Sequence, residues 1–446
     1  MKRIALVLVL AGAVAMVVAT ASSSRSPAVA VPHSATKPAK EPGPLLAVVP
    51  GARGPLIGHA DTRAIWVGRR SPKLRIFNPV RAWAYCPDGS AIALATQPET
   101  MPGSGKLQIV DPRLVRRIAL VRLPWGNARA VAWGPGRINV VLEDFDAGEI
   151  HVVSVDGSTY RPVARRTLPG AVFGATRVGQ TIVLVTGPAH GIGTASLSVI
   201  DSDGSVRSVE LPQIAAGMDT PDDVNTDFSK LHQNIPGLAV DPAGRAFVVP
   251  ASGPVAEVAL PTLAVSYHSL SQPVSLLGRV RDWFEPKAEA KGTNGPMRTA
   301  QWLGDGVVAV TGGDESATMG QDHQLRASWT PAGLTLIDTN TWGTKLVDRG
   351  ADSLEVAGET MLVTGARWED SARSGMGFAA YSFDGTRRLS VLRGDAAYVL
   401  LAWRGKAYVG VGESNGATVV DLAKGTVVGV RYAPLAQLLI APSSAP

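Results

Sequence analysis

The chain has 446 residues, one cysteine and a formal net charge of +6 at pH 7. A single cysteine excludes intramolecular disulfide bonds, so packing alone must hold the fold. Much of the positive charge lies in four segments, 69–75, 113–122, 161–166 and 387–393. Each segment is the last strand of a repeated unit, and this distribution argues against a nucleic-acid partner. Two interpretations of this positive charge are left open. It either protects exposed sheet edges from pairing, or it contacts a polyanion or cell-wall component.

Residues 1–21 have the pattern of a secretory signal peptide. Lys2 and Arg3 precede an apolar run over 4–20, and a small-x-small cleavage site follows at 19–21. The run is shorter than the roughly 20 residues of a membrane-spanning helix. We therefore predict cleavage and an extracellular or cell-envelope location. An uncleaved anchor is the alternative, and it is the one case in which we expect contact with a membrane.

The rest of the chain divides into a tether, a folded region and a tail. Residues 22–44 are rich in Ser, Ala, Pro and Lys without a hydrophobic period, which predicts a disordered tether. We predict that 45–441 folds and that 442–446 is a disordered tail. A single core of about 400 residues would tend to split into domains. An array of repeats avoids this limit, because each unit packs only against its neighbours.

Short apolar strands ending in Asp or Leu recur along the folded region. Their last residues are Asp61, Asp111, Asp156, Asp201, Leu260, Asp338, Asp384 and Asp421. Several successive spacings are close to 45 residues, and tight turns with Asp-Gly, Pro-Gly or Gly-Lys join the strands. This period is typical of a β-propeller in which each repeat is one four-stranded blade. We predict an all-β fold that consists of a single propeller.

The two ends of the folded region bear on the number of blades. Residues 45–79 supply three strands without a first strand, whereas 436–441 is a spare strand without a blade. We predict eight blades, in a ring closed by the C-terminal strand, which completes the N-terminal blade. Seven blades with an N-terminal appendage is the alternative. Tryptophans in the inner strands are predicted to pack between blades; they are Trp83, Trp133, Trp302 and Trp403.

Connection lengths distinguish the two faces of the predicted disc. The first-to-second and third-to-fourth turns of a blade lie on one face, and here they are short. The other connections lie on the opposite face and contain all the long insertions, at 97–105, 144–149, 187–194, 213–235, 271–297, 311–332 and 366–376. Binding sites usually lie on elaborated loops carried by a rigid scaffold. We predict that this loop face carries the function, with plain solvated loops as the alternative.

The long insertions contain aromatic and charged residues that suit ligand binding. We predict ligand contacts from Arg281, Trp283, Trp329, Arg367 and Trp368. Aromatic side chains next to acidic ones suit a cationic, sugar-like or protein ligand. The expected partner is therefore a protein or a cell-envelope component, bound by a monomer.

Acidic and histidine side chains in the same insertions form a candidate metal site. The candidate ligands are Asp222, Asp223, Asp227, His232, Asp314, Glu315 and His323. Residues 223–227 begin like a calcium loop, but Phe228 and Asn234 stand where an EF-hand requires Gly and Glu. A dedicated EF-hand is thus excluded, while an irregular site for calcium or another divalent ion stays open. We predict no other cofactor.

Two strand-turn phrases resemble a known group of proteins. AYCPDG at 84–89 and GLAVDPAG at 237–244 resemble phrases of secreted bacterial β-propellers with WD40-, NHL- and YncE-like repeats. The resemblance covers nearly all of 45–441 and extends to exported propellers of high-GC bacteria. It implies the propeller fold but no particular activity, because the Gly-His and Trp-Asp dipeptides of WD repeats are absent from their expected places.

Two functional hypotheses follow. The first is an exported, non-catalytic interaction scaffold that binds its ligand through the elaborated face. The second is a metal-assisted hydrolase, lyase or lactonase that acts on a small molecule at the channel mouth. We favour the first, because no catalytic motif is present in the sequence.

Overall fold

The computed structural model describes most of the predicted folded region. The described residues are 45–49, 56–61, 64–67, 73–76, 78–97, 104–219, 232–271, 293–319, 325–369, 372–412, 416–432 and 438–441. Every regular element within these ranges is a β-strand, and no helix there is long and apolar enough to cross a membrane. The predicted signal peptide, tether and tail lie outside the described residues.

Four sheets consist of four antiparallel strands in chain order. One contains β5 (Val80–Tyr85), β6 (Ile92–Thr96), β7 (Ser104–Asp111) and β8 (Arg116–Trp125). The next contains β9 (Asn127–Gly134), β10 (Arg137–Asp144), β11 (Glu149–Asp156) and β12 (Pro162–Pro169). The other two contain β18 (Gly237–Val240), β19 (Arg245–Val249), β20 (Val255–Ala259) and β21 (Ala264–His268), and β31 (Ala397–Trp403), β32 (Lys406–Val411), β33 (Gly416–Asp421) and β34 (Thr426–Tyr432).

Two larger sheets contain additional strands. A five-stranded sheet contains β13 (Ala171–Val178), β14 (Thr181–Gly187), β15 (Gly191–Ile200), β16 (Val206–Asp219) and β17 (His232–Asn234). A nine-stranded sheet contains β22 (Thr293–Gly304), β23 (Val307–Met319), β24 (Leu325–Pro331), β25 (Leu334–Asp338), β26 (Gly343–Asp348), β27 (Ser353–Ala357), β28 (Thr360–Glu369), β29 (Ala372–Ser382) and β30 (Arg387–Val391). In the nine-stranded sheet, β24 joins two four-stranded units, because it pairs with β23 on one side and with β28 on the other.

The last sheet combines both ends of the folded region. It contains β1 (Leu45–Val49), β2 (Leu56–Asp61), β3 (Ala64–Val67), β4 (Lys73–Arg75) and β35 (Leu438–Ile440). The C-terminal strand β35 pairs antiparallel with β1, with Ala47 opposite Leu439. Strands from opposite ends of the chain therefore share one sheet.

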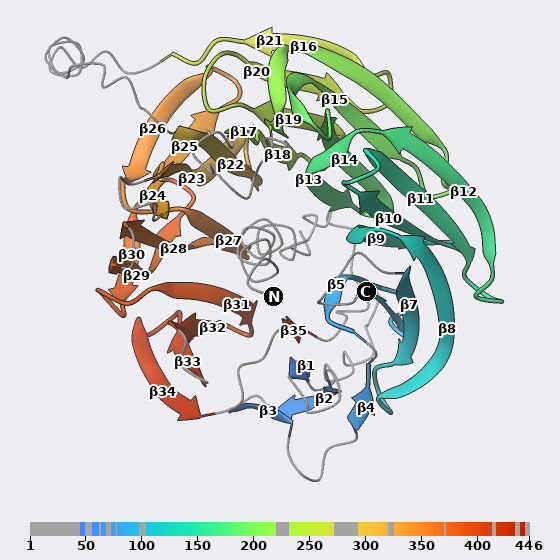
Figure 1. Ribbon diagram of the computed structural model, residues 1–446. Helices are drawn as coiled ribbons and strands as arrows, with labels where there is room; N and C mark the ends of the chain where they lie inside the picture. The colour runs from blue at the N-terminus through green and yellow to red at the C-terminus, as the bar shows by residue number, and fades with distance from the viewer. Residues whose placement is uncertain are drawn as a thin grey trace, which may run out of the picture.

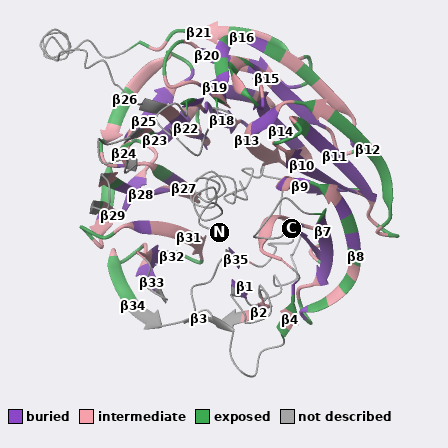
Figure 2. Ribbon diagram, in the orientation of Figure 1, coloured by how far each residue is buried: buried purple, intermediate pink, exposed green. Residues whose placement is uncertain are grey.

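The sheets stand around a common centre, with the first strand of each complete sheet innermost and the last strand outermost (Figure 1). Buried residues are concentrated on the middle strands, and exposed residues on outer strands such as β8 and β12 (Figure 2). The core lies between neighbouring sheets. Trp133 is 5% exposed in a cluster shared by the β5–β8 and β9–β12 sheets, and Trp302 stacks on Phe247 with ring centroids 5.5 Å apart. The predicted packing of inner-strand tryptophans between sheets is confirmed at these two positions.

The recurrent aspartates of the sequence hold the turn between the third and fourth strands of a sheet. Oδ1 of Asp156 accepts hydrogen bonds from the backbone N–H groups of Ser158 (3.0 Å) and Thr159 (2.7 Å). Asp384 accepts from the Ser382 hydroxyl (2.6 Å) and the Thr386 N–H (2.8 Å), and these bonds lower the pKa of Asp384 to about 2. Asp side chains favour such turns because they bond the backbone two residues on. The repeated aspartates are therefore structural.

Candidate functional site

On one face of the fold, several strands continue beyond the four-stranded part of their sheet, and some of them reach a neighbouring sheet or four-stranded unit. We call this layer the cross-blade belt. It consists of β17 and β24 together with residues 191–194 of β15, 215–219 of β16, 293–297 of β22, 313–319 of β23, 366–369 of β28 and 372–375 of β29. These strands belong to second-to-third or sheet-to-sheet connections, so they lie on the face predicted to be elaborated.

The prediction that this face consists of loops is wrong for the described parts of 187–194, 213–235, 311–332 and 366–376. These segments are largely strands, because each places its backbone N–H and C=O groups beside another extended segment. Extended backbone gains paired hydrogen bonds in this way instead of leaving them to solvent. The segment 144–149, also predicted to be an insertion, is a short hairpin turn between β10 and β11.

Two contacts within the belt join separate sheets or separate four-stranded units. Next to β17, the Ile235 N–H donates to the Pro296 carbonyl (3.0 Å), and the Arg298 N–H donates to the Ile235 carbonyl (2.8 Å). Further along, β24 pairs with β28, with Trp329 opposite Trp368. The belt thus connects the β13–β17 sheet to both units of the nine-stranded sheet.

Three predicted site residues form a row across the belt. Glu315 of β23 lies opposite Trp329 of β24, and Trp329 lies opposite Trp368 of β28. Directly opposed residues of antiparallel strands project from the same face of the sheet. Both tryptophans are half-buried, so part of each side chain remains accessible. The row therefore presents two indole groups and one carboxyl group from three successive strands.

Trp329 is held in place from two sides. Its indole Nε1–H donates to Oδ2 of Asp352 at 2.9 Å, and the same oxygen accepts the Ala366 N–H at 3.0 Å. Its ring lies against Gly313, where a Cβ atom would overlap the indole. A glycine at position 313 therefore makes room for the ring, and the Asp352 carboxylate fixes its orientation.

Glu315 sits between β23 and β17. Its Oε2 accepts a hydrogen bond from Nε2 of the buried Gln233 at 3.0 Å. Burial raises the pKa of Glu315, although the Gln233 hydrogen bond opposes that shift. A carboxyl group in this environment can donate as well as accept hydrogen bonds when it is protonated.

The other predicted ligand-binding residues do not join the row. Arg367 is exposed and precedes Trp368 on β28, so strand alternation places its side chain on the opposite face. Arg281 and Trp283 lie outside the described residues. Of five predicted ligand-binding residues, the belt brings together Trp329 and Trp368.

Only three of the seven candidate metal ligands lie within the described residues. Oδ1 of Asp314 is 2.9 Å from Nη1 of Arg298, which already neutralises that carboxylate. His232 is exposed and adjoins Gln233 on β17, so alternation directs the two side chains to opposite faces. Asp222, Asp223, Asp227 and His323 lie outside the described residues. Within the described ranges, no group of three or more His, Cys, Asp or Glu side chains is placed to hold a metal ion, and the metal site stays a prediction.

Several residues of this region have no sequence signal. Gln233, Asp352 and Arg298 become important only through partners that are distant in the chain. Glu355 of β27 is a further example: its Oε2 is buried without a hydrogen-bond partner among the described residues, and burial raises its pKa to about 8. In the alternating sequence of β27, a glutamate would be read as solvent-facing.

The belt has the chemistry of a binding surface. Half-buried indole groups offer large apolar contact area with few rotatable bonds, and they stack on sugars or cations. The Glu315 carboxyl supplies a directional polar group at one end of the row. Paired strands hold these groups more firmly than loops would.

Comparisons with known proteins extend the description of the fold. No protein-family model and no curated protein sequence matches the chain. Among solved structures, the dihydro-heme d1 dehydrogenase NirN in complex with DHE is similar, with a TM-score of 0.53 and 12% identity; the match covers 92% of this chain and 78% of that one. Apo AztD from Citrobacter koseri is also similar, with a TM-score of 0.50 and 11% identity, over 90% of this chain and 99% of that one.

Both of these neighbours are β-propeller-type proteins. At such low identity, the likeness concerns the fold and not the activity. Together with the four-stranded antiparallel sheets arranged around a common centre, it supports a fold of the propeller type. The chain is an all-β protein of the β-propeller type.

Proposed function

We propose that this protein is an exported, non-catalytic interaction scaffold that binds a protein or cell-envelope ligand through the cross-blade belt. The observation that carries the proposal is the row of Glu315, Trp329 and Trp368 across three paired strands. In the proposed molecule the ring has eight blades, and β35 closes it by completing the sheet of β1. The pairing of β35 with β1 supports this arrangement.

Rigid presentation of aromatic groups favours binding. Association is weakened when side chains and loops must be ordered at the interface, and a preorganised surface avoids much of this loss. Trp329 is already fixed by Asp352 and Gly313 in the free protein. Tryptophan is also among the residues that contribute most to binding free energy at protein interfaces.

The environment of the acidic residues favours binding over metal-assisted chemistry. Asp314 is paired with Arg298, and Glu315 is bonded to Gln233, so both carboxyl groups already have partners in this chain. A metal ion would have to displace these partners. Partnered side chains of this kind suit a surface that recognises a ligand without transforming it.

The proposal is tested with the double variant Trp329→Ala/Trp368→Ala. Full-length protein is probed against a glycan array and against cross-linked envelope fractions, and the partner found is titrated by interferometry. We expect the double variant to weaken binding more than tenfold, because loss of hot-spot residues costs at least about 2 kcal/mol. The exposed Leu346, on β26 away from the belt and from the outer rim at β8 and β12, gives the control Leu346→Ala. Equal binding by wild type and double variant would contradict the role of the belt.

Export is tested on the mature protein. Mass spectrometry of the secreted or envelope fraction should find Ser22 as the first residue, because the cleavage site ends at Ala21. An intact N-terminus in the membrane fraction would instead support the anchored alternative.

A further inference from the structure

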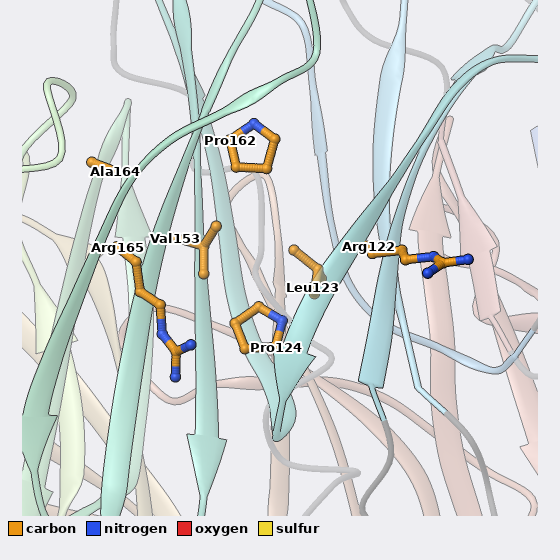
Figure 3. A pocket seen from close by; sticks show the side chains of 7 residues that line it. All are labelled: Arg122, Leu123, Pro124, Val153, Pro162, Ala164 and Arg165. Atoms are coloured by element: carbon orange, nitrogen blue, oxygen red, sulfur yellow. The ribbon is translucent and has the colours of Figure 1, made fainter.

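A shallow groove lies between two neighbouring sheets on the outer rim, away from the belt. Its volume is about 340 Å³, and its lining residues come from β8, β11 and β12. They are Leu123 and Pro124 of β8, Val153 of β11, and Pro162, Ala164 and Arg165 of β12, with Arg122 at one edge. In Figure 3, Leu123 and Pro124 face Pro162 across Val153, while the Arg122 side chain extends away from them.

Large hydrophobic side chains are exposed on both outer strands that bound the groove. Ile118, Leu120 and Trp125 of β8 are 44%, 43% and 45% exposed, and Val163 of β12 is 52% exposed. Together with Leu114, these are five of the nine large hydrophobic side chains that are exposed among the described residues. Leu120 lies opposite Gln108 and projects from the other face of β8, so the apolar walls of the groove itself are Leu123, Pro124, Val153 and Pro162.

The same rim is strongly basic. Segments 111–125 and 156–169 contain seven arginines: Arg113, Arg116, Arg117, Arg122, Arg161, Arg165 and Arg166. The two acidic residues in these segments are Asp111 and Asp156, and each accepts hydrogen bonds from backbone N–H groups of its own turn. The rim therefore has an excess of positive charge that would attract an acidic ligand.

Arg165 is the basic group positioned at the groove. Its Nη2 lies 3.1 Å from Nε2 of the buried His151, on the face of β12 that looks towards β8. Burial and the Arg165 charge lower the pKa of His151, although the Glu149 and Asp144 carboxylates oppose that shift; Glu149 Oε2 lies 3.6 Å from His151 Nε2. The imidazole is therefore neutral at neutral pH and leaves the Arg165 charge as the positive group on this wall.

Two prolines shape how a ligand can be recognised. Pro124 and Pro162 lie on opposite walls and have no backbone N–H to offer. A ligand therefore cannot simply add a strand to either wall at these positions. Recognition must come from side chains: an apolar group over Val153, and a carboxylate towards Arg165.

We propose that the groove between β8 and β12 binds an extended, acidic segment of a partner protein that inserts an apolar side chain beside Leu123 and Pro124. This site is separate from the cross-blade belt, and the inference does not depend on the function proposed for the belt. A narrow groove with apolar walls fits a single inserted side chain, whereas an anionic membrane would call for a broad contact. The peptide is therefore the occupant favoured by the geometry.

The test begins with a random peptide display library selected against the full-length protein. We expect enriched sequences to combine Asp or Glu with Leu, Phe or Trp. A fluorescent copy of an enriched peptide is then titrated against Arg165→Glu, and its affinity should fall by about tenfold or more.

A matched control separates the groove from general electrostatics. Arg388→Glu makes the same change of charge on β30, where the residue is exposed. Binding that falls equally in this control, or enriched peptides without acidic residues, would overturn the proposal. Binding to phosphatidylglycerol vesicles that the peptide does not displace would overturn it in favour of a membrane contact.

Discussion

The two faces of the ring differ in how their connections are built. On one face, turns between third and fourth strands are held by an aspartate that bonds the next few backbone N–H groups, as at Asp156 and Asp384. On the other face, the connections extend into the belt and pair with strands of other four-stranded units, as at Trp329 and Trp368. The first face depends on local sequence, whereas the second depends on contacts between distant segments. The predictions below probe this difference.

The largest effect is expected from a glycine of the belt. Gly295 has φ +103°, and a Cβ atom there would overlap the Gln233 carbonyl oxygen. Gly295→Ala should therefore lower the free energy of unfolding by about 3 kcal/mol, through backbone strain together with loss of the β17–β22 contact. Gly136, in a turn of the other face, has φ +74° and open space around it. Gly136→Ala should cost about 1 kcal/mol.

Urea unfolding of Gly295→Ala and Gly136→Ala measures the two losses in the free energy of unfolding. Equal losses of stability would mean that the belt adds no constraint beyond that of an ordinary turn.

A smaller effect is expected when one hydrogen bond of the belt is removed. Trp329→Phe keeps an aromatic ring but removes the indole N–H that Asp352 accepts. We expect a loss of about 1 kcal/mol, because Asp352 Oδ2 keeps its bond from the Ala366 N–H. Trp125→Phe on exposed β8 is the control, with a change within about 0.5 kcal/mol. Thermal unfolding distinguishes the Trp329→Phe and Trp125→Phe variants. An unchanged Tm for Trp329→Phe would mean that the hydrogen bond to Asp352 does not stabilise the position of Trp329.

The smallest effects are expected in the pH dependence of stability. A carboxyl group on one face stabilises the fold more as pH rises, and one on the other face stabilises it less. The pKa of Asp384 is lowered to about 2 by its turn hydrogen bonds, so its contribution is present above about pH 3.8 and lost as pH falls towards 2. The pKa of Glu315 is raised by burial, so its contribution is complete below about pH 4.5 and lost as pH rises through the raised pKa. In a profile of Tm against pH, Asp384→Asn should thus make the fall of Tm at acidic pH less steep. Glu315→Gln should make the fall of Tm at higher pH less steep.

A second buried carboxyl serves as the control for the alkaline limb. Burial raises the pKa of Glu355 to about 8, and this residue lies on β27 outside the belt. Glu355→Gln should flatten the same limb independently, so the double variant Glu315→Gln/Glu355→Gln should show the sum. An alkaline limb that neither substitution changes would contradict both assignments.

Much of the fold could be predicted because it repeats. The aspartates at the ends of third strands and the tight turns are local signals, and they locate blade strands such as β11 and β33. Inner tryptophans such as Trp133 also follow from their position in the repeat. Each of these features recurs, so a single sequence contains several independent copies of the same evidence.

The belt could not be predicted in the same way, because its strands pair with partners in other sheets. One signal was present: residues 325–331 alternate apolar and polar side chains, as a half-buried strand does. Nothing local indicates that Trp329 meets Trp368, or that Glu315 meets Gln233. The individual residues of the site were thus partly identified, while their arrangement required the fold.

The pairing of β35 with β1 has a consequence for how the molecule is made. β1 is synthesised among the first strands of the folded region, but its neighbour β35 is the last. Contacts between such distant segments form slowly, because a long stretch of chain must be ordered before they are gained. Until then, the edge of β1 is open to pairing with other chains. A nascent molecule would therefore need protection by a chaperone until its C-terminal strand arrives.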